Sequence, residues 1–446
     1  MDRVIESMYN FNENLTNTIL DFKTIDEIKK RIVDSIFVAY GAMNAEPVRI
    51  SKISLLPSCG NLNSTIYFTR DKASSDVASY LNGCMTRYID YNDTYLSKEA
   101  LHPSDNIPPI LAVGEAERMD GSDIIKGIAM AYQVVGAFSD ASSIRDRGWD
   151  HVTYISISSA AGIGSMMKLD IEKFSHLISL AINNNISLRQ TRVGELSMWK
   201  GCTVANAGRN SIFAYLIAKN GFTGPQPIFT GERGFFRQVS GELNLDFERN
   251  RVLRTMIKHY PVEYHAMSSV EVALKLKEQI QGEIQSIEVE TFQVAYDIIV
   301  KDPEKWAPKT KETADHSMPY IIAYTLNYGA PKPESYYEPF LSDNNILKLM
   351  KLMKFEVTEE FNRMYPEFLP CKITIKTDKG TWTEEVDVPL GHFRNPYSWD
   401  NLKEKGFRVT RNDTFVDEVI KIVRDFEAHD ASELLEVMGN ASAGKQ

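Results

Sequence analysis

The stretch ISISSAAGIGSMM, residues Ile155–Met167, decides the fold class of this 446-residue chain. It is rich in Ser, Ala and Gly, whose small side chains let neighbouring helices approach closely. We therefore expect this stretch to form a core helix, despite its two glycines. A helix of this kind requires other helices around it. The sequence therefore predicts a helical bundle.

The stretches before this helix also have helical patterns. Isoleucines recur at helical spacing from Ile25 to Ile36, after a capping-box pattern formed by Thr24 and Glu27. Ser122 is the expected N-cap of a further helix, which is apolar nearly all round. The first half of the chain is therefore predicted to be helical throughout.

The pattern changes after about residue 260. Residues 284–292 alternate like a strand, and residues 371–388 read as two strands joined by a short hairpin loop at Asp378-Lys379-Gly380. Residues 343–355, DNNILKLMKLMKF, have a helical pattern between these strands. The tail is helical again, with Asp413 as its expected N-cap.

These patterns predict a mainly α protein with two domains. Residues 1–262 and 395–446 are expected to form a large all-helical domain, and residues 263–394 a smaller α+β lid domain.

Composition excludes several classes of protein. The net charge of −10 argues against a protein that coats nucleic acid. The four cysteines form no CxxC pair, which disfavours a zinc ribbon, an iron–sulfur cluster and a disulfide framework. The N-terminus resembles no signal peptide, and no apolar run reaches the ~20 residues that cross a membrane. We expect a soluble, cytoplasmic protein.

The stretch RYIDYNDTYLSKEALHPSDN, residues 87–106, raises the main functional question. Asp90, Asp93 and His102 are close in sequence, and they could form a metal site, an acid/base apparatus or a solvated loop. The spacing lacks the alternating ligands and central Gly of an EF-hand, which disfavours metal. Large aromatic residues alternate with the polar ones, so partial burial is expected. Buried carboxylates and imidazoles need partners and are functional candidates.

Three further segments carry candidate residues. His151 precedes the small-residue helix, whose dipole would keep the imidazole neutral. Arg192 and Lys200 lie in a cationic segment of an otherwise acidic protein, and Arg is suited to binding carboxylates. Glu263 and His265 follow a Pro where the fold class changes. For each segment, exposed or structural charges are the alternative interpretation.

Known nucleotide and hydrolase motifs are absent from the sequence. It contains no P-loop, GxGxxG, GxSxG or HExxH motif. What remains is a set of His, Asp, Lys and Arg residues without a visible cofactor. Such a set suits proton transfer on a small molecule that bears carboxylates.

Several blocks resemble the successive signatures of the MmgE/PrpD family. They are NGCMTRYIDYNDTYLSKEALHPSDN, KGCTVANAGRNSIFAYLIAKNGFTGP, YPVEYHAMSSVEVAL and TADHSMPYIIAY, in the family's order, with GHFRNPYSW resembling the last block. The family includes 2-methylcitrate dehydratase, cis-aconitate decarboxylase and iminodisuccinate epimerase. Its fold is a helical domain with an α+β lid, usually as a homodimer that needs no metal.

The resemblance places family residues on this chain. The Asp, Thr and His of the first block match Asp90, Thr94 and His102. The remaining matches are His151, Lys200 and Lys258. Combined with the residue patterns, the predicted catalytic residues are Asp90, His102, Lys200, His265 and His151, and the predicted substrate-binding residues are Thr94, Arg192, Lys258 and Glu263.

The blocks are most similar to the forms found in 2-methylcitrate dehydratases. The decarboxylase has an essential His where this chain has Glu263, which counts against decarboxylation. The resemblance therefore implies a hydro-lyase that dehydrates 2-methylcitrate, or citrate, in propionate catabolism through the methylcitrate cycle. Decarboxylation, epimerisation or a non-catalytic tricarboxylate-binding role are the alternatives. No cofactor, nucleic acid or membrane partner is implied.

The mechanism implied is an acid/base elimination. His102 would exchange a proton with the substrate and would be held in one tautomer by Asp90. Lys200, Arg192 and Lys258 would offset the negative charge that develops. His265 or His151 would take the second proton-transfer role, and the sequence does not choose between them.

Overall fold

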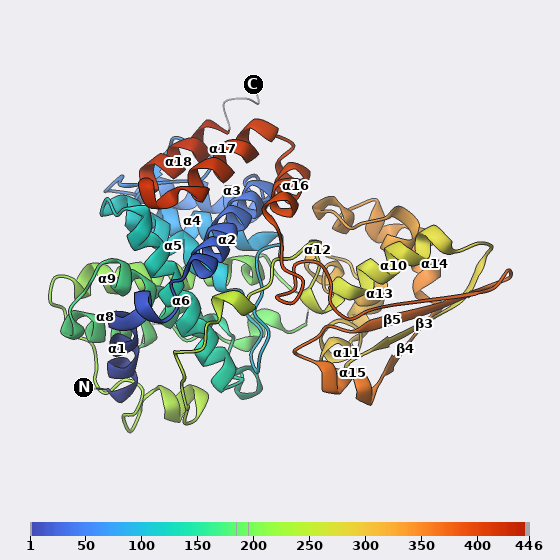
Figure 1. The fold of residues 1–446 in the computed structure, drawn as a ribbon, viewed down its shortest axis with the longest axis horizontal. Coiled ribbons are helices and arrows are strands. Elements are labelled where there is room, and N and C mark those ends of the chain that lie inside the picture. The colour runs from blue at the N-terminus through green and yellow to red at the C-terminus, as the bar shows by residue number, and fades with distance from the viewer. Residues whose placement is uncertain (1, 184, 195, 442–446) are drawn as a thin grey trace. The chain divides into compact units, whose positions relative to one another are not determined.

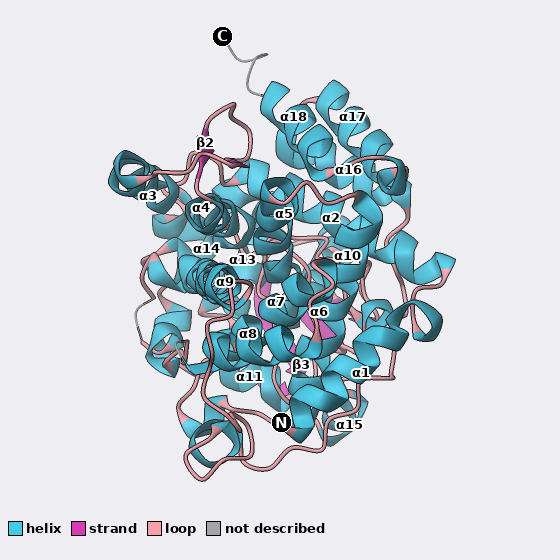
Figure 2. Ribbon diagram, turned by 90° about the vertical axis from the view of Figure 1, so that its left-hand side faces the viewer, coloured by secondary structure: helices cyan, strands magenta, loops and turns pink. Residues whose placement is uncertain are grey.

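The structure, a computed structural model, describes residues 2–183, 185–194 and 196–441. It divides into two compact units, each described by itself below (Figure 1). Unit 1 comprises Met1–Val193, Met198–Met256 and Ser398–Gln446, and unit 2 comprises Gly194–Ser197 and Ile257–Tyr397. The sequence placed the two junctions after residues 262 and 394. Helices dominate the described residues and strands are few, which confirms the mainly α fold (Figure 2).

Unit 1 is built almost entirely of helices. Its two short strands, β1 (Ser64–Thr65) and β2 (Lys72–Ala73), pair antiparallel. Across the described part of the chain, no helix combines the length and the apolar character that crossing a membrane requires. The helices of unit 1 are α1 (Arg3–Thr18), α2 (Phe22–Gly41), α3 (Glu46–Leu55), α4 (Ser75–Tyr88), α5 (Ile107–Ala116), α6 (Gly121–Ala141), α7 (Val152–Met166), α8 (Ile171–Asn183), α9 (Trp199–Ala218), α16 (Trp399–Thr410), α17 (Asp413–Arg424) and α18 (Ala431–Asn440).

The small-residue helix α7 is the centre of unit 1, as predicted. Every one of its residues is buried, and it packs against α6, α8 and α9. A Cβ atom added to Gly162 would lie 2.7 Å from the carbonyl oxygen of Gly127 in α6, so only glycine fits at this crossing. The composition of α7 therefore sets how closely its neighbours can approach.

Helix starts were predicted less well than helix existence. The polar residues that precede each helix compete for the N-cap, and the cap is the one with extended backbone whose side chain accepts a main-chain N–H. The capping side chains are those of Asp21, Asp120 and Asn412, in place of the predicted Thr24, Ser122 and Asp413.

The C-terminal helices return to the first helices of unit 1. Helices α16 and α17 both pack on α2, and Figure 1 shows them beside it. Lys405 of α16 is completely buried, and its Nζ atom lies 2.6 Å from Asp34 Oδ1 of α2. The same Nζ donates to the main-chain oxygen of Tyr91, at 3.0 Å. Lys405 thus joins α16 to α2 through a buried ion pair, and to the segment that holds Asp90 through a hydrogen bond.

Unit 2 contains a four-stranded mixed sheet in the order β4-β3-β5-β6. Strand β3 pairs parallel with β4 and antiparallel with β5, and β5 and β6 form the predicted hairpin. Helix α10 packs on β5 and β6, and α13 packs on α10. The elements are α10 (Met267–Gln279), β3 (Ile284–Thr291), α11 (Gln293–Ile299), α12 (Lys311–Ala314), α13 (Met318–Tyr328), α14 (Asn344–Met350), β4 (Met353–Val357), α15 (Glu359–Met364), β5 (Cys371–Thr377) and β6 (Thr381–Val386).

One predicted helix of unit 2 is half wrong. The stretch DNNILKLMKLMKF begins as α14, but its last residues belong to β4. The apolar spacing suits a helix, yet the parallel pairing with β3 decides the conformation. Tertiary pairing overrides local propensity here, as is common for short strands.

Candidate active site

The site in unit 1 forms where α4 ends against the start of α9. A Cβ on Gly83 of α4 would lie 2.9 Å from the Cβ of Ala205, and a Cβ on Gly201 would lie 3.0 Å from Tyr88. These glycines let the two helices touch. The last turn of α4 therefore lies next to Lys200, in the first turn of α9.

Asp90 follows α4 in a left-handed conformation, with φ of 53°. Such a conformation is uncommon outside glycine and often marks a functional position. The Asp90 carboxylate is buried and forms ion pairs with Arg87 and with Lys200, whose Nζ lies 3.4 Å from Oδ2. All three side chains are only 2% exposed. Asp90 thus gathers two cations in a buried setting, where charges interact strongly.

His102 is held by contacts to both ring nitrogens. Its Nδ1 atom lies 2.7 Å from the main-chain oxygen of Asp93, and its Nε2 atom lies 2.9 Å from Nη2 of Arg87. A carbonyl only accepts and a guanidinium only donates, so Nδ1 carries the proton and Nε2 presents its lone pair. The hydroxyl of Thr94 is a further neighbour, 3.4 Å from Nδ1.

The prediction that Asp90 fixes the tautomer of His102 is therefore wrong. The nearest oxygen of Asp90 lies 3.9 Å from Nε2, beyond hydrogen-bond distance. Arg87 links Asp90 to His102 indirectly, because its guanidinium binds both the Asp90 carboxylate and the His102 ring. The main chain of Asp93 takes the orienting role.

The segment after His102 is part of the core and no solvated loop. Asn106 accepts hydrogen bonds from the hydroxyls of Ser158 and Ser159 in α7, both at 2.7 Å. The main-chain N–H of Ser104 donates to Asp93 Oδ1 at 2.8 Å. These bonds fix the backbone on both sides of the imidazole.

Two carboxyl groups beside this segment hold protons unusually well. Burial raises the pKa of Asp93 to about 6, although hydrogen bonds from Ser104 and Tyr132 and the charge of Arg31 lower it. Burial also raises the pKa of Asp105 to about 7. The pKa values of both carboxyl groups are therefore close to physiological pH.

His151 is the N-cap of α7, and its ring centroid lies 6.1 Å from that of His102. Its pKa is lowered to about 3, first by burial and then by the charges of Arg192, Arg87 and Arg189, although Asp150 raises it. His151 is therefore neutral, as predicted. The main causes are burial and the guanidinium groups.

Asp150 holds Arg192 next to His151. The Nε atom of Arg192 lies 2.8 Å from Asp150 Oδ2, and Nδ1 of His151 lies 3.3 Å from Oδ1. Burial alone would raise the pKa of Asp150, but Arg192, His151 and the N–H of Val152 outweigh it and lower the pKa to about 2. Among the described residues, the buried Nε2 of His151 and Nη2 of Arg192 have no hydrogen-bond partner.

Unit 2 contains a second arrangement around a histidine. Glu263 accepts hydrogen bonds from the main-chain N–H of His265 at 2.9 Å and from Nδ1 of its ring at 2.8 Å. Nε2 of His265 lies 3.3 Å from the hydroxyl of Tyr365. Burial would raise the pKa of Glu263, but His265, His316 and Lys258 outweigh it and lower the pKa to about 2.

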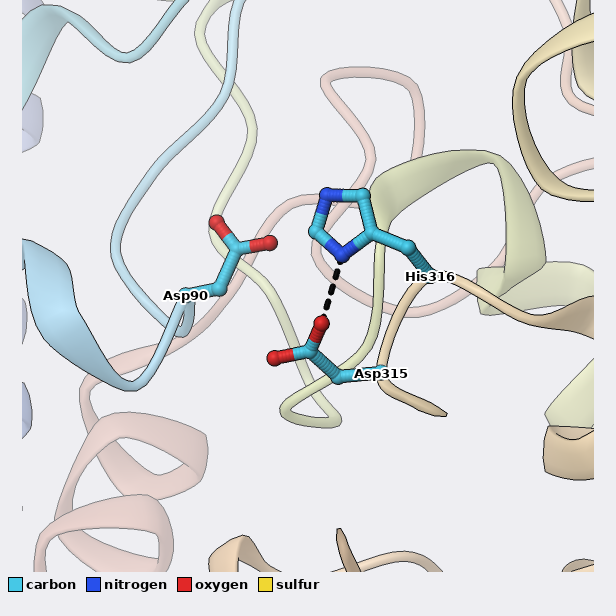
Figure 3. A group of neighbouring side chains, drawn as sticks. All are labelled: Asp90, Asp315 and His316. Carbon is cyan, nitrogen blue, oxygen red and sulfur yellow. Dashed lines mark hydrogen bonds and ion pairs between the residues drawn. The ribbon is translucent and has the colours of Figure 1, made fainter. Parts of the chain in front are cut away.

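Asp315 and His316 lie beside Glu263 in the same unit. Nδ1 of His316 lies 2.5 Å from Asp315 Oδ1 (Figure 3), and Lys311 Nζ lies 2.7 Å from Oδ2. The main-chain oxygen of Asp315 accepts from the N–H of Glu263, at 2.8 Å. These contacts hold the start of α13 against the Glu263–His265 pair.

The predicted residues thus fall into two groups. Several functional candidates were missed, and Arg87 is the most important of them. Its position three residues before Asp90, one turn of a helix, was the signal that could have revealed it. Unit 1 gathers Asp90, Thr94, His102, His151, Arg192 and Lys200, and unit 2 gathers Lys258, Glu263 and His265.

Comparisons with known proteins agree on one family. The profile of the MmgE/PrpD N-terminal domain matches residues 6–248, and that of the MmgE/PrpD C-terminal domain matches residues 260–425.

Three curated relatives are named as dehydratases. A mitochondrial 2-methylcitrate dehydratase of Yarrowia lipolytica is 28% identical over 70% of this chain and 65% of its own length, so the match spans less than two thirds of that protein. A 2-methylcitrate dehydratase of Escherichia coli K12 is 27% identical over 71% of each chain. The alkylcitrate dehydratase phiI of a fungal species is 27% identical over 77% of this chain and 74% of its own.

Proposed function

Since the chain belongs to the MmgE/PrpD family, we propose that it is a hydro-lyase that dehydrates 2-methylcitrate, or the related citrate, to the corresponding cis-aconitate. The observation that carries the proposal is the His102 arrangement. The partly buried His102 imidazole directs the lone pair of Nε2 toward Arg87, and Asp90, which forms ion pairs with both Arg87 and Lys200, lies 3.9 Å from the same nitrogen. This combination suits the removal of a proton next to a carboxylate.

The reaction is a β-elimination. The C–H bond beside a carboxylate breaks, and its electron pair forms the C=C bond while the hydroxyl group leaves as water with a second proton. Negative charge develops next to a carboxylate that is already charged, so fixed cations lower the barrier. Lys200 and Arg192 supply such cations in unit 1, each held by a buried carboxylate.

The two histidines of unit 1 suit different roles. We assign the base role to His102, because its Nδ1 is committed to a carbonyl and its Nε2 is an acceptor. His151 is a poor proton donor at neutral pH, because its pKa is near 3. We assign the role of proton donor to His265, the other histidine that the sequence offered for the second proton transfer. Thr94, Lys258 and Glu263 are proposed as substrate contacts.

The test is direct. The protein is incubated separately with 2-methylcitrate, citrate and cis-aconitate, and conjugated-alkene absorbance and CO₂ are followed. We expect alkene formation from 2-methylcitrate without CO₂. Release of CO₂ from cis-aconitate would favour decarboxylation, and no reaction with any of the three would refute the proposal. Racemisation of an amino-dicarboxylate would point to epimerisation.

We also propose that the enzyme needs no metal or organic cofactor and acts as a homodimer on a tricarboxylate. Elemental analysis of active protein tests the first part: stoichiometric metal, with activity lost to a chelator, would contradict it. Native mass spectrometry of the purified chain tests the second, and a monomer at working concentration would contradict it.

A further inference from the structure

Arg87 binds two residues of the site, the carboxylate of Asp90 and the imidazole of His102. Its Nη1 atom pairs with Asp90, and its Nη2 atom donates to Nε2 of His102 at 2.9 Å. The side chain is 2% exposed, so both bonds form in a buried environment. Arginine is suited to this because its planar guanidinium presents several donors in a fixed geometry.

The contact to His102 has a chemical consequence. Nδ1 of the ring is committed to the main-chain oxygen of Asp93 at 2.7 Å, so a proton can be exchanged only through Nε2. The lone pair of Nε2 accepts a hydrogen bond from Arg87. While that bond persists, Nε2 cannot take a proton from carbon. His102 can act as a base only after Arg87 has moved to another acceptor.

We propose that Arg87 is a specificity-determining residue, whose guanidinium leaves His102 for a carboxylate of the hydroxy-tricarboxylate substrate and thereby frees Nε2. The inference rests on the proposed function and deepens it. A guanidinium and a carboxylate are both charged and can form two parallel hydrogen bonds, whereas the neutral imidazole offers one lone pair, which favours the exchange. Asp90 keeps the guanidinium anchored through Nη1 during the exchange.

The exchange couples recognition to catalysis. The proton leaves the substrate carbon for Nε2 of His102, its electron pair enters the C=C bond, and the hydroxyl departs as water with a second proton from the proposed donor, His265. A ligand that lacks the carboxylate bound by Arg87 leaves Nε2 occupied. Selection for that carboxylate therefore acts on the chemical step as well as on binding.

The first test measures binding by calorimetry with unreactive ligands. Propane-1,2,3-tricarboxylate is compared with glutarate, which lacks the central carboxylate, and with methylsuccinate, which lacks a terminal one. In Arg87→Gln, binding of the tricarboxylate should weaken about 10- to 100-fold, while that of one dicarboxylate changes less than threefold. Equal weakening of all three ligands, or no weakening of any, would overturn the proposal.

Two controls accompany this measurement. Arg209→Gln removes a guanidinium from a more exposed ion pair with Asp76 between α9 and α4, and should leave all three affinities unchanged. Arg87→Lys keeps the positive charge and serves where Arg87→Gln does not fold. It should show the same carboxylate-selective loss, because an ammonium cannot bind two partners in the guanidinium geometry.

The second test separates this inference from the proposed function. A crystal structure with bound propane-1,2,3-tricarboxylate should show Nη2 of Arg87 on a carboxylate and away from Nε2 of His102. Arg87 still bonded to His102 in that complex would refute the exchange. The proposed function fails on different grounds, when the wild-type protein dehydrates neither 2-methylcitrate nor citrate.

Discussion

His102 in unit 1 and His265 in unit 2 are both held through Nδ1, but by acceptors of different charge. The acceptor of His102 is a neutral main-chain carbonyl, and a guanidinium occupies its other nitrogen. The acceptor of His265 is the carboxylate of Glu263, and its other nitrogen faces the hydroxyl of Tyr365.

This difference shows how the surroundings of a histidine can suit it to act as a base or as an acid. The Nε2 atom of His102 accepts a hydrogen bond from Arg87, and an acceptor nitrogen suits a base. The His265 ring lies beside an ionised carboxylate that can balance a positive charge, which suits an acid. The four predictions below probe this contrast, from the largest expected effect to the smallest.

The largest effect is expected at the base. His102→Ala should lower turnover of 2-methylcitrate by about 10²- to 10⁴-fold, the usual loss when a general base is removed. The melting curve should stay close to that of the wild type, because the backbone of this segment is held by Asn106 and Ser104. Steady-state kinetics measures the loss. His429→Ala, at a partly exposed histidine of unit 1, is the control. Turnover within threefold of wild type would make His102 a structural residue.

The next effect is expected at the cation beside the base. Lys200→Ala should lower kcat/KM by about 10- to 100-fold, because one charged contact to the substrate and to Asp90 is lost. Both kcat and KM should change, since a cation binds the ground state as well as the transition state. Lys168→Ala, at an exposed ion pair with Asp123, should change neither. A change confined to thermal stability would remove Lys200 from the site.

The sequence predicted which residues form the site better than it predicted the hydrogen bonds and ion pairs between them. Asp90, His102 and Lys200 were candidates from the residue patterns and from the resemblance, and the structure brings them together where α4 ends against α9. The orienting partner of His102 is a main-chain carbonyl, which no side-chain pattern can reveal. The spacing of Arg87 and Asp90 could have revealed their ion pair, but the contact of Arg87 with His102 joins residues 15 apart, which no local pattern gives.

The fold was predictable where one interaction dominates. The small-residue composition of α7 and the alternation in β5 and β6 each admit one structure. Helix starts were missed because several polar residues compete for each cap. Strand β4 was missed because its pairing with β3 is not encoded locally. These failures are of the kind expected when tertiary contacts decide between similar local energies.

The third prediction concerns a substitution that gives His265 a neutral acceptor at Nδ1, like the acceptor of His102. Glu263→Gln replaces the carboxylate with a neutral acceptor, as His102 has, and keeps the hydrogen-bonding oxygen. Turnover should fall, but less than in His102→Ala. The free energy of unfolding near neutral pH should fall by about 1–3 kcal/mol, because hydrogen bonds to a charged group are lost.

The pH dependence of this variant has a defined sign. The pKa of Glu263 is depressed to about 2 in the folded protein, so its stabilisation is complete above the usual glutamate value and is lost as the pH falls. The stability difference from wild type, measured by urea unfolding, should shrink below about pH 4.3. Glu290→Gln, at a half-exposed ion pair on β3, is the control. A difference that does not depend on pH would show that the charge of Glu263 is unimportant.

The smallest effect is expected at Asp93, whose main chain orients His102. Its pKa is raised to about 6, mainly by burial, so ionising it costs stability. That cost begins as the pH rises above the unfolded value, near 3.9, and is complete above about pH 6. Asp93→Asn cannot ionise and escapes the cost. Its stability relative to wild type should therefore rise by about 1 kcal/mol between about pH 5 and about pH 7.

Both oxygens of the Asp93 carboxyl group accept hydrogen bonds, from Ser104 and Tyr132, and an amide nitrogen cannot accept either one, so the variant should be less stable than wild type at pH 5. Urea unfolding at both pH values measures the change, with Asp123→Asn as the control. The orientation of His102 depends on the main-chain oxygen of residue 93, which the substitution keeps, so turnover should fall far less than in His102→Ala. Loss of turnover as large as that of His102→Ala would mean that the Asp93 side chain takes part in the proton transfer.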